Sequence, residues 1–298
     1  MKLIVSTSIL LLLATGAGAE PKPNILVILA DDLGYGDVGY QGCKDVPTPN
    51  IDSLAKNGVR FASGYVTAPL CSPSRAGLLS GRSGTRFGFE FNVGGSDKGG
   101  KNVAGIPVTE KIFPERMKAA GYSTAIFGKW HVGFLPKLAP AKRGFDEWEC
   151  FFGACRRYFP GGWDEVTHNG KKLKSYDYTT YLFARDAAAF IGNHRHEPWF
   201  VYLPFNAVHS PMDSPPALMK RFKHLPGKRQ QFAGMLFAMD EGIGMVLDKV
   251  RECGLEENTL IFFASDNGGP TGDNTSRNDP LSGFKGQLLE GGIREPFC

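Results

Sequence analysis

The sequence predicts an α/β fold, with a central, mostly parallel sheet flanked by helices. Short apolar runs rich in β-branched residues alternate along the chain with longer segments of helical periodicity, as in strand–helix–strand units. Polar residues directly follow several of the apolar runs. In open α/β sheets, ligands bind at the carboxyl ends of the strands, so this pattern also indicates a site. The length of 298 residues suits one large domain or two smaller ones.

Four runs are expected to be strands. The first, residues 23–30, is almost continuously apolar and ends at two aspartates, which fits a strand buried on both faces. The other three span residues 123–127, 199–203 and 259–264.

Helices are expected between these strands. They span residues 50–58, 113–120, 178–191 and 230–253, and glycines follow the second and the fourth, as is common after a helix C-terminus. Two long segments, residues 88–105 and 139–174, are rich in glycine and aromatics and are expected to be ordered loops facing a substrate.

Residues 1–19 have the pattern of a secretory leader. A lysine precedes an apolar run, and Ala17-Gly18-Ala19 precedes Glu20, as at a signal-peptide cleavage site. The mature protein is therefore expected to comprise residues 20–298 and to be secreted or periplasmic. The alternative is an uncleaved N-terminal anchor, although the apolar run is short for a membrane span and no other span is visible.

The composition does not indicate nucleic-acid binding, and it leaves the disulfide pairing of the cysteines undetermined. A formal net charge of +4, without a basic run interleaved with aromatics, does not indicate nucleic-acid binding. Among six cysteines, Cys150 and Cys155 are close enough in sequence for a local disulfide, but connectivity cannot be deduced from spacing. Neither these cysteines nor the scattered histidines have the spacing of a zinc site.

The polar residues at the strand ends could meet at one site. They are Asp31 and Asp32, Lys129 and His131, His209, and Asp266 and Asn267. Carboxylate and amide oxygens favour Ca²⁺ or Mg²⁺ over a soft transition metal. The alternatives are that the acidic pairs only cap turns, that His131 is a core histidine and that Lys129 is a surface charge.

The stretch of residues 70–82 is the most informative in the chain. Cys71 lies two residues before Pro73 and four before Arg75, ahead of a small-residue, leucine-containing segment. The proline predicts a tight turn at Cys71, just before a helix N-terminus, where backbone N–H groups and Arg75 favour an anion. The alternative is a small buried thiol.

This stretch, CSPSRAGLLSGR, resembles the signature of the sulfatase family. Further blocks in the family's order are ADDLGYGD, GKWH, FNAVHSP, SDNGG and GFKGQLLEGGIREP, so the resemblance covers nearly all of residues 23–298. It implies an alkaline-phosphatase-like core without the family's smaller C-terminal antiparallel subdomain. The chain alone is therefore expected to expose apolar surface and to be weakly stable or weakly active.

The resemblance also implies a mechanism. A maturation enzyme would convert Cys71 to formylglycine, whose hydrate attacks the sulfur of a sulfate ester. His209 or Lys285 would protonate the leaving alcohol, and His131 would take a proton as sulfate is expelled. The implied catalytic residues are Cys71, Arg75, Lys129, His131, His209 and Lys285, and the implied ligands of Ca²⁺, with Mg²⁺ as the alternative, are Asp31, Asp32, Cys71, Asp266 and Asn267.

The substrate implied is a sulfate ester of a carbohydrate, such as a glycosaminoglycan-like or algal polysaccharide. Two other functions fit the same residues. One is hydrolysis of phosphate or phosphonate esters, because the cations and metal would also suit phosphate. The other is non-catalytic binding of sulfated glycans. The remaining histidines, His168, His194, His196 and His224, match no motif and are expected to be surface or loop residues.

Overall fold

A computed structural model describes residues 22–94, 105–161 and 163–298. Its described residues contain one seven-stranded sheet with the strand order β5-β4-β3-β2-β6-β1-β7. The pairings from β3 to β7 are parallel, and β3–β4 and β4–β5 are antiparallel. The predicted mostly parallel α/β fold is therefore confirmed. The predicted leader and most of the expected loop at 88–105 lie outside the described residues.

The four predicted strands form the centre of the sheet. They are β1 (Asn24–Ala30), β2 (Ser123–Lys129), β6 (Trp199–Pro204) and β7 (Thr259–Ser265). Side chains alternate between the two faces: Leu26 and Ile28 of β1 pack into one apolar cluster, whereas Leu29 packs into the other. Because all four strands are parallel, their carboxyl ends lie at one edge of the sheet.

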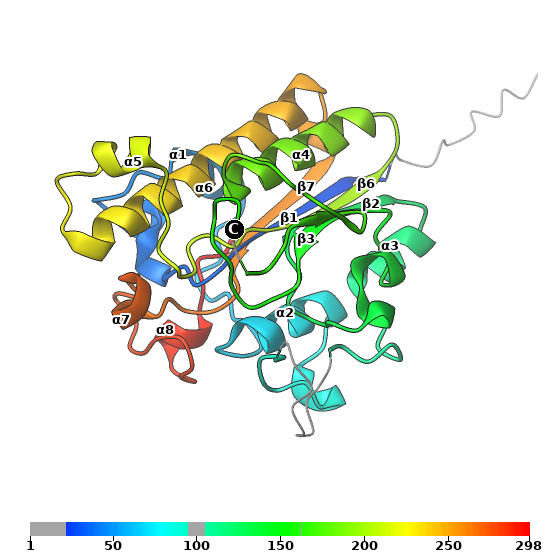
Figure 1. Ribbon diagram of the computed structural model, residues 1–298, viewed down its shortest axis with the longest axis horizontal. Coiled ribbons are helices and arrows are strands. Elements are labelled where there is room, and N and C mark those ends of the chain that lie inside the picture. Colours follow the sequence, from blue (N-terminus) through cyan, green and yellow to red (C-terminus); the bar gives the residue numbers. More distant parts are fainter. Residues whose placement is uncertain (1–21, 95–104, 162) are drawn as a thin grey trace, which may run out of the picture.

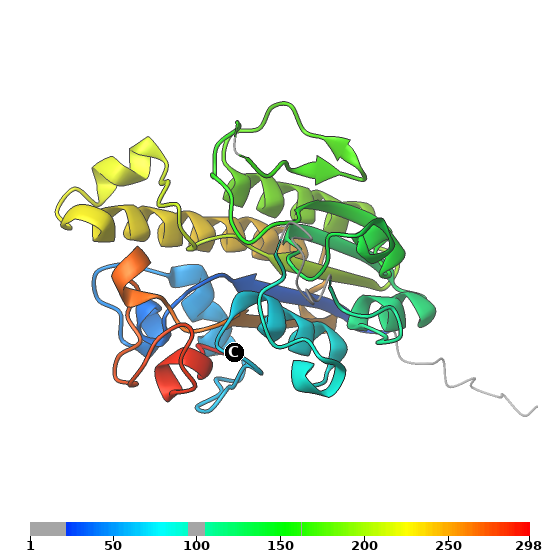
Figure 2. The ribbon, with the colours of Figure 1, turned by 60° about the horizontal axis from the view of Figure 1, so that its bottom comes forward.

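Helices cover both faces of this sheet (Figures 1 and 2). On one face, α4 (Thr179–Asn193) packs against α6 (Gly227–Glu252), and α1 (Pro49–Asn57) packs against α6. On the other face lie α2 (Cys71–Ser80) and α3 (Phe113–Ala119). The remaining helices are short: α5 (Pro216–Arg221), α7 (Thr271–Asn274) and α8 (Glu290–Ile293).

The expected loop at 139–174 was wrong in part. It contains β3 (Glu147–Phe151), β4 (Thr167–His168) and β5 (Lys171–Lys172), which extend the sheet beyond β2. The sequence of β3, EWECF, alternates acidic and apolar residues and is short, and β4 and β5 have two residues each. Such segments lack the long apolar run that identified the other strands.

Two further expectations can be compared with the structure. All six cysteines lie in the described residues and none forms a disulfide, so the local bridge between Cys150 and Cys155 is not present. Within residues 22–94, 105–161 and 163–298, no helix is long and apolar enough to cross a membrane.

Candidate active site

The ends of the four central strands bring distant polar residues together, as the sequence indicated. Asp31 and Asp32 follow β1, Lys129 is the last residue of β2, and Asp266 follows β7. The backbone N–H of Asp31 donates to the carbonyl of Ala207 beyond β6, and the N–H of Asp32 donates to Asp266 Oδ1. These bonds fix the loops after three strands relative to each other.

Helix α2 delivers Cys71 to this edge, but the predicted turn before the helix was wrong. Cys71 is the first residue of α2, and Pro73 lies within its first turn, where a missing N–H costs no intrahelical hydrogen bond. The preceding Ser72 keeps a helical position because its N–H donates to Asn92 Oδ1 and its hydroxyl accepts from the N–H of Val93.

Two buried cations hold two of the carboxylates. Arg75 donates from Nε to Asp266 Oδ2 at 2.8 Å, and its Nη2 lies 2.7 Å from the same oxygen. Lys129 Nζ donates to Asp31 Oδ2 at 2.6 Å. All four side chains are fully buried, so each carboxylate has the nearby positive charge that its burial requires. Arg75 thus positions Asp266 in addition to supplying charge.

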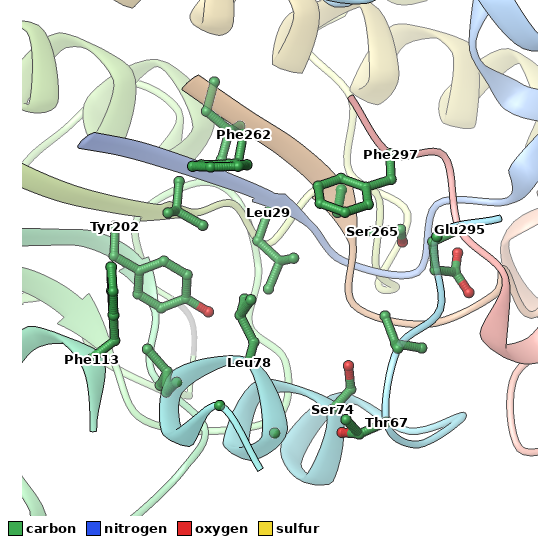
Figure 3. Close-up of a pocket in the computed structure, with 18 of the residues that line it drawn as sticks. Leu29, Thr67, Ser74, Leu78, Phe113, Tyr202, Phe262, Ser265, Glu295 and Phe297 are labelled. Atoms are coloured by element: carbon green, nitrogen blue, oxygen red, sulfur yellow. The ribbon is translucent and has the colours of Figure 1, made fainter. Parts of the chain in front are cut away.

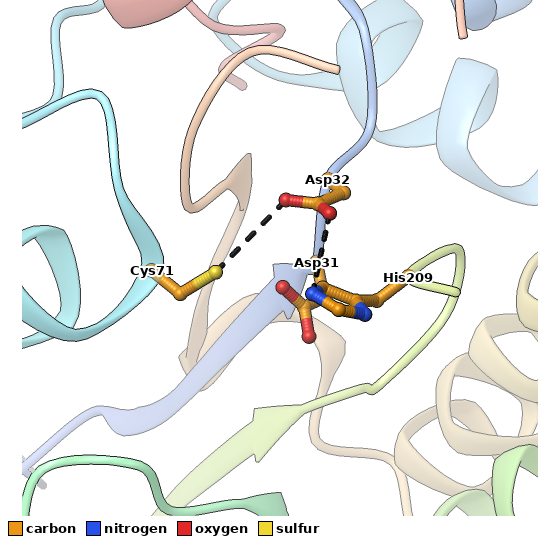
Figure 4. A group of neighbouring side chains, drawn as sticks. All are labelled: Asp31, Asp32, Cys71 and His209. Atoms are coloured by element: carbon orange, nitrogen blue, oxygen red, sulfur yellow. Dashed lines mark hydrogen bonds and ion pairs between the residues drawn. The ribbon is translucent and has the colours of Figure 1, made fainter. Parts of the chain in front are cut away.

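Asp32 is the centre of a second group (Figure 4). Its carboxylate oxygens lie 2.7 and 2.8 Å from Lys285 Nζ, and Asn267 Nδ2 donates to Oδ1 at 2.7 Å. His209 Nε2 lies 3.4 Å from Oδ2, and the Cys71 thiol lies 3.9 Å from Oδ1. Asp32 also has a positive φ of 62°, an unfavourable backbone conformation of the kind that clusters at functional sites.

This group fits a divalent cation. Ligand atoms of Asp31, Asp32, Cys71 and His209 all lie within 4.8 Å of one another. Among the described residues, Asp31 Oδ1 and Asn267 Oδ1 are buried without a hydrogen-bond donor, and Arg75 Nη2 lies 3.6 Å from Asp31 Oδ1. Buried oxygens without donors are costly unless a cation faces them, and oxygen donors suit a hard ion. Asp266, expected as a ligand, has Oδ2 occupied by Arg75, while in the described part of the chain Oδ1 accepts only the N–H of Asp32 at 3.2 Å, so its role as a ligand stays a prediction. His209 is an additional neighbour.

The side chains of His131 and Cys71 have pKa values shifted from their ordinary ones. His131 is fully buried with a φ of 48°, and in the described structure both its ring nitrogens lack a hydrogen-bond partner. Burial, reinforced by the charge of Lys129, holds the pKa of His131 well below its usual value. Burial raises the pKa of the Cys71 thiol. The unmodified thiol is therefore a poor nucleophile at neutral pH, while His131 is neutral and able to accept a proton.

The structure identifies positioning residues that sequence reasoning missed. Asn274 Nδ2 donates to the carbonyls of Asp32 and Val208, so one buried amide joins the loops after β1 and β6. The hydroxyl of Ser265 accepts from the N–H of Leu33 and donates to the carbonyl of Asn267. Asn274 has no local signal in the sequence because both of its acceptors are distant in the chain.

A large cavity of about 670 Å³ lies elsewhere (Figure 3). It is bounded by α2, by β1, β6 and β7, and by Glu295 and Phe297 near the end of the chain, and its lining is mainly apolar. It contains none of the acidic residues of the site and therefore does not belong to the chemistry described above.

Comparison with known proteins places these residues in a family context. The family model described as Sulfatase matches residues 23–298. The N-acetylgalactosamine-6-sulfatase of Homo sapiens is 35% identical over 302 residues, which cover 94% of this chain and 57% of that protein. The arylsulfatase of Klebsiella aerogenes is 30% identical, covering 90% of this chain and 71% of that protein.

Solved structures agree with these relatives. The crystal structure of Ps i-CgsB in complex with k-i-k-neocarrahexaose has a TM-score of 0.87 and 38% identity, covering 93% of this chain and 65% of that chain. The PsFucS1 sulfatase from Pseudoalteromonas sp. has a TM-score of 0.78 and 28% identity, covering 93% of this chain and 61% of that chain. The chain spans less than two thirds of the length of the first of these curated relatives.

Proposed function

Because the chain belongs to the sulfatase family, we propose that it contributes the catalytic site of a hydrolase acting on sulfate esters of carbohydrates. The observation that carries the proposal is the position of Cys71 at the start of α2. Its thiol is 1% exposed and lies in one cluster with Asp31, Asp32 and His209. A buried thiol of raised pKa is a poor nucleophile toward a sulfate ester. It is better suited to be the precursor of a modified residue that carries out the attack.

The groups that this site would hold are a formylglycine made from Cys71 and a Ca²⁺ ion, with Mg²⁺ as the alternative, bound by Asp31, Asp32, Asp266, Asn267 and residue 71. When present, the aldehyde hydrate supplies a hydroxyl nucleophile, and the ion supplies positive charge beside it. The donor-free oxygens Asp31 Oδ1 and Asn267 Oδ1 support the ion, and their hardness supports Ca²⁺ or Mg²⁺ over a soft metal.

The side chains of the protein then have distinct tasks. Burial opposes the charged form of Lys285, but the surrounding acidic groups outweigh it and raise its pKa, so Lys285 remains a cation that stabilises the sulfate oxygens. His209 Nδ1 donates to the carbonyl of Ser210, 2.5 Å away. In the protonated, imidazolium form of the ring, Nε2 therefore carries the second proton, which it would give to the leaving alcohol, returning the ring to the neutral form. His131, neutral and without a partner, accepts the proton released as sulfate departs.

Three measurements test the chemistry. The mass of the peptide containing residue 71, from protein made in its own host, should show the aldehyde, and an intact thiol in every fraction would refute the mechanism. Cys71→Ala should abolish turnover while the far-UV circular dichroism stays unchanged, whereas Cys155→Ser, the matched control, should retain it. Chelation should remove activity, and add-back of Ca²⁺ or Mg²⁺ identifies the ion.

Substrate class requires separate assays. The N-acetylgalactosamine-6-sulfatase relative and the neighbour solved in complex with k-i-k-neocarrahexaose support a sulfated sugar. Hydrolysis should therefore be measured on sulfated carrageenan oligosaccharides, on N-acetylgalactosamine 6-sulfate, and on paired aryl sulfate and aryl phosphate. Faster turnover of the aryl phosphate would favour the phosphatase alternative. Binding of sulfated glycan without turnover, in protein that carries the aldehyde, would favour a non-catalytic binder.

The proposal includes export through residues 1–19. The apolar run and the Ala17-Gly18-Ala19 sequence support it. Amino-terminal sequencing of the secreted or periplasmic protein should begin at Glu20, and retention of residues 1–19 would contradict cleavage at that position.

A further inference from the structure

A second cluster of metal-ligating side chains lies apart from the active site, between β3, β4 and α4. Ligand atoms of Glu149, His168 and Asp186 all lie within 4.8 Å of one another. Glu149 and His168 are directly opposite each other in the antiparallel pair β3–β4, and Asp186 comes from α4. None of these residues belongs to the sulfatase site described above.

Glu149 is the observation that points to a ligand. Its side chain is 1% exposed, yet within the described part of the chain its Oε1 has no hydrogen-bond donor. Glu149 has the same strand parity as Phe151, whose ring stacks on Phe183 of α4, so its carboxylate points toward α4 and Asp186. Two carboxylates that face each other, one 1% exposed and the other 31% exposed, favour either a shared proton or a cation between them.

The histidine is oriented as a metal ligand would be. His168 Nδ1 lies 3.3 Å from Glu149 Oε2, and Nε2 lies 3.8 Å from Glu147 Oε1. Metal-bound histidines commonly direct their second ring nitrogen toward a carboxylate, which orients the ring. His168 is 35% exposed, so the cluster has an opening to solvent through which an ion and a water ligand can enter.

We propose that Glu149, His168 and Asp186 bind a divalent transition-metal cation of the Zn²⁺ type. One imidazole with two carboxylates favours such an ion over Ca²⁺, which prefers oxygen ligands alone. Three protein ligands leave a fourth position for water. Zn²⁺–ligand distances of about 2.0–2.2 Å require the side chains to draw in slightly from their positions without the ion. The ion joins the β3–β4 edge of the sheet to α4 and stabilises that contact.

The nearby charges do not replace the ion. Arg185 Nε lies 3.7 Å from Asp186 Oδ1, but Arg185 is 53% exposed and its Nη1 donates to Asp177. It therefore partly neutralises the outer carboxylate, while Glu149 keeps its hydrogen bond with His168 through Oε2 and, within the described residues, has no donor at Oε1. The remaining competitor is a proton shared by Glu149 and Asp186, consistent with burial raising the pKa of Glu149 to about 9.

The test uses the full chain with Ca²⁺ in excess to saturate the active site, followed by titration with Zn²⁺. Elemental analysis after equilibrium dialysis should give one more bound Zn²⁺ in the wild type than in His168→Gln or Asp186→Asn. The matched control is His194→Gln, because His194 also contacts a carboxylate, Glu197, but on an exposed surface; it should bind as the wild type does. The Tm should rise with Zn²⁺ in the wild type and not in His168→Gln.

Co²⁺ substitution provides a second readout. The wild type should show visible absorption bands that are lost in His168→Gln, without the thiolate charge-transfer bands of cysteine ligation. Equal Zn²⁺ stoichiometry in the wild type and His168→Gln would place the metal elsewhere and overturn the proposal. Absence of bound Zn²⁺ in the wild type would overturn it too, in favour of the shared proton. Neither outcome depends on sulfatase turnover, so the two proposals fail separately.

Discussion

At the scale of single residues, His131 determines how the activity should depend on pH. Its pKa lies well below the usual value because the ring is buried beside Lys129. The proton-accepting, neutral form therefore predominates down to a pH below the ordinary histidine pKa of about 6.5. Because His131 acts as sulfate departs, the titration should appear in kcat: we expect kcat to stay level as the pH falls to 6.5 and to decline only at lower pH, where the ring becomes protonated.

Substitution of His131 distinguishes its protonation from that of other groups that titrate in the same pH range. His131→Gln should lower kcat by about 10²–10⁴-fold, the usual contribution of a general base, and should remove the acid limb from the pH profile. The control is His224→Gln, an exposed histidine. An unchanged acid limb in His131→Gln would show that another group titrates there.

His209 and Lys285 should respond differently to the leaving group. Lys285 holds its proton because its pKa is raised, so it supplies charge equally for every substrate. His209 gives up a proton, and an alcohol of high pKa needs that proton more than a phenol does. We expect His209→Asn to reduce kcat/KM by about 10²-fold or more for a sugar sulfate and much less for 4-nitrophenyl sulfate.

The control for this prediction is Lys285→Met, which should reduce kcat/KM for both substrates by a similar factor. Leaving-group plots across a series of aryl sulfates provide the measurement. A steeper dependence on leaving-group pKa in Lys285→Met than in His209→Asn would exchange the two roles.

Sequence reasoning reached these residues but not their contacts. The strand-end rule indicated that Asp31 and Asp266 meet, because parallel strands share one carboxyl edge. It could not indicate that Arg75 pairs with Asp266, or Lys129 with Asp31. Those pairs depend on the angle of α2 over the sheet and on side-chain rotamers, neither of which leaves a periodic pattern in the sequence.

At the scale of elements, a residue of α6 caps α1. The backbone N–H groups of Asn50 and Ile51, in the first turn of α1, donate to the buried carboxylate of Asp240. Thr48 makes no such cap. Asp240→Ala leaves buried N–H groups without acceptors, and we expect it to lower the free energy of unfolding by about 2–4 kcal/mol.

Urea denaturation provides the measurement for this cap. Asp240→Asn keeps one acceptor oxygen and should have an intermediate effect. Asp248→Ala, an exposed position on the same helix, should change the free energy of unfolding by less than about 0.5 kcal/mol. Equal effects at positions 240 and 248 would contradict a capping role.

The strands were predicted correctly where the sequence contains a long run of apolar residues. The strands β1, β2, β6 and β7 are buried apolar runs and were located to within a few residues. The strand β3, next to the two-residue strands β4 and β5, was missed because Glu147 and Glu149 interrupt its apolar residues. A strand whose apolar residues alternate with acidic ones is therefore harder to recognise from sequence than a continuous apolar run.

At the scale of the whole molecule, the position of β7 at the end of the sheet leaves apolar surface beside it. Within the described residues β7 has one strand neighbour, β1, and only Phe297 and Cys298 begin to pair along its other side. Leu260 and Phe262 of β7 are 50% and 37% exposed and line the cavity of about 670 Å³ (Figure 3). The sheet thus has an incomplete edge next to an open cavity.

Glu295 makes this region unusual. Its side chain is 1% exposed, and in the described chain neither carboxylate oxygen has a hydrogen-bond donor. Burial, with Asp266 and Asp32 nearby, raises its pKa well above the ordinary value. A buried carboxyl without a donor, beside an apolar cavity, would be stabilised by any group that supplied apolar contacts and a hydrogen-bond donor.

We therefore expect a chain of residues 20–298, expressed by itself, to bind the apolar dye ANS in its folded state, because large exposed apolar surface binds such dyes. Replacing Leu260 and Phe262 by lysine should reduce the fluorescence and raise the solubility, since charge on an edge strand opposes association. Met245→Lys, on the exposed side of α6 and 44% exposed, is the control and should leave the fluorescence unchanged. Equal fluorescence in the double variant and the wild type would place the dye outside the cavity and contradict the prediction.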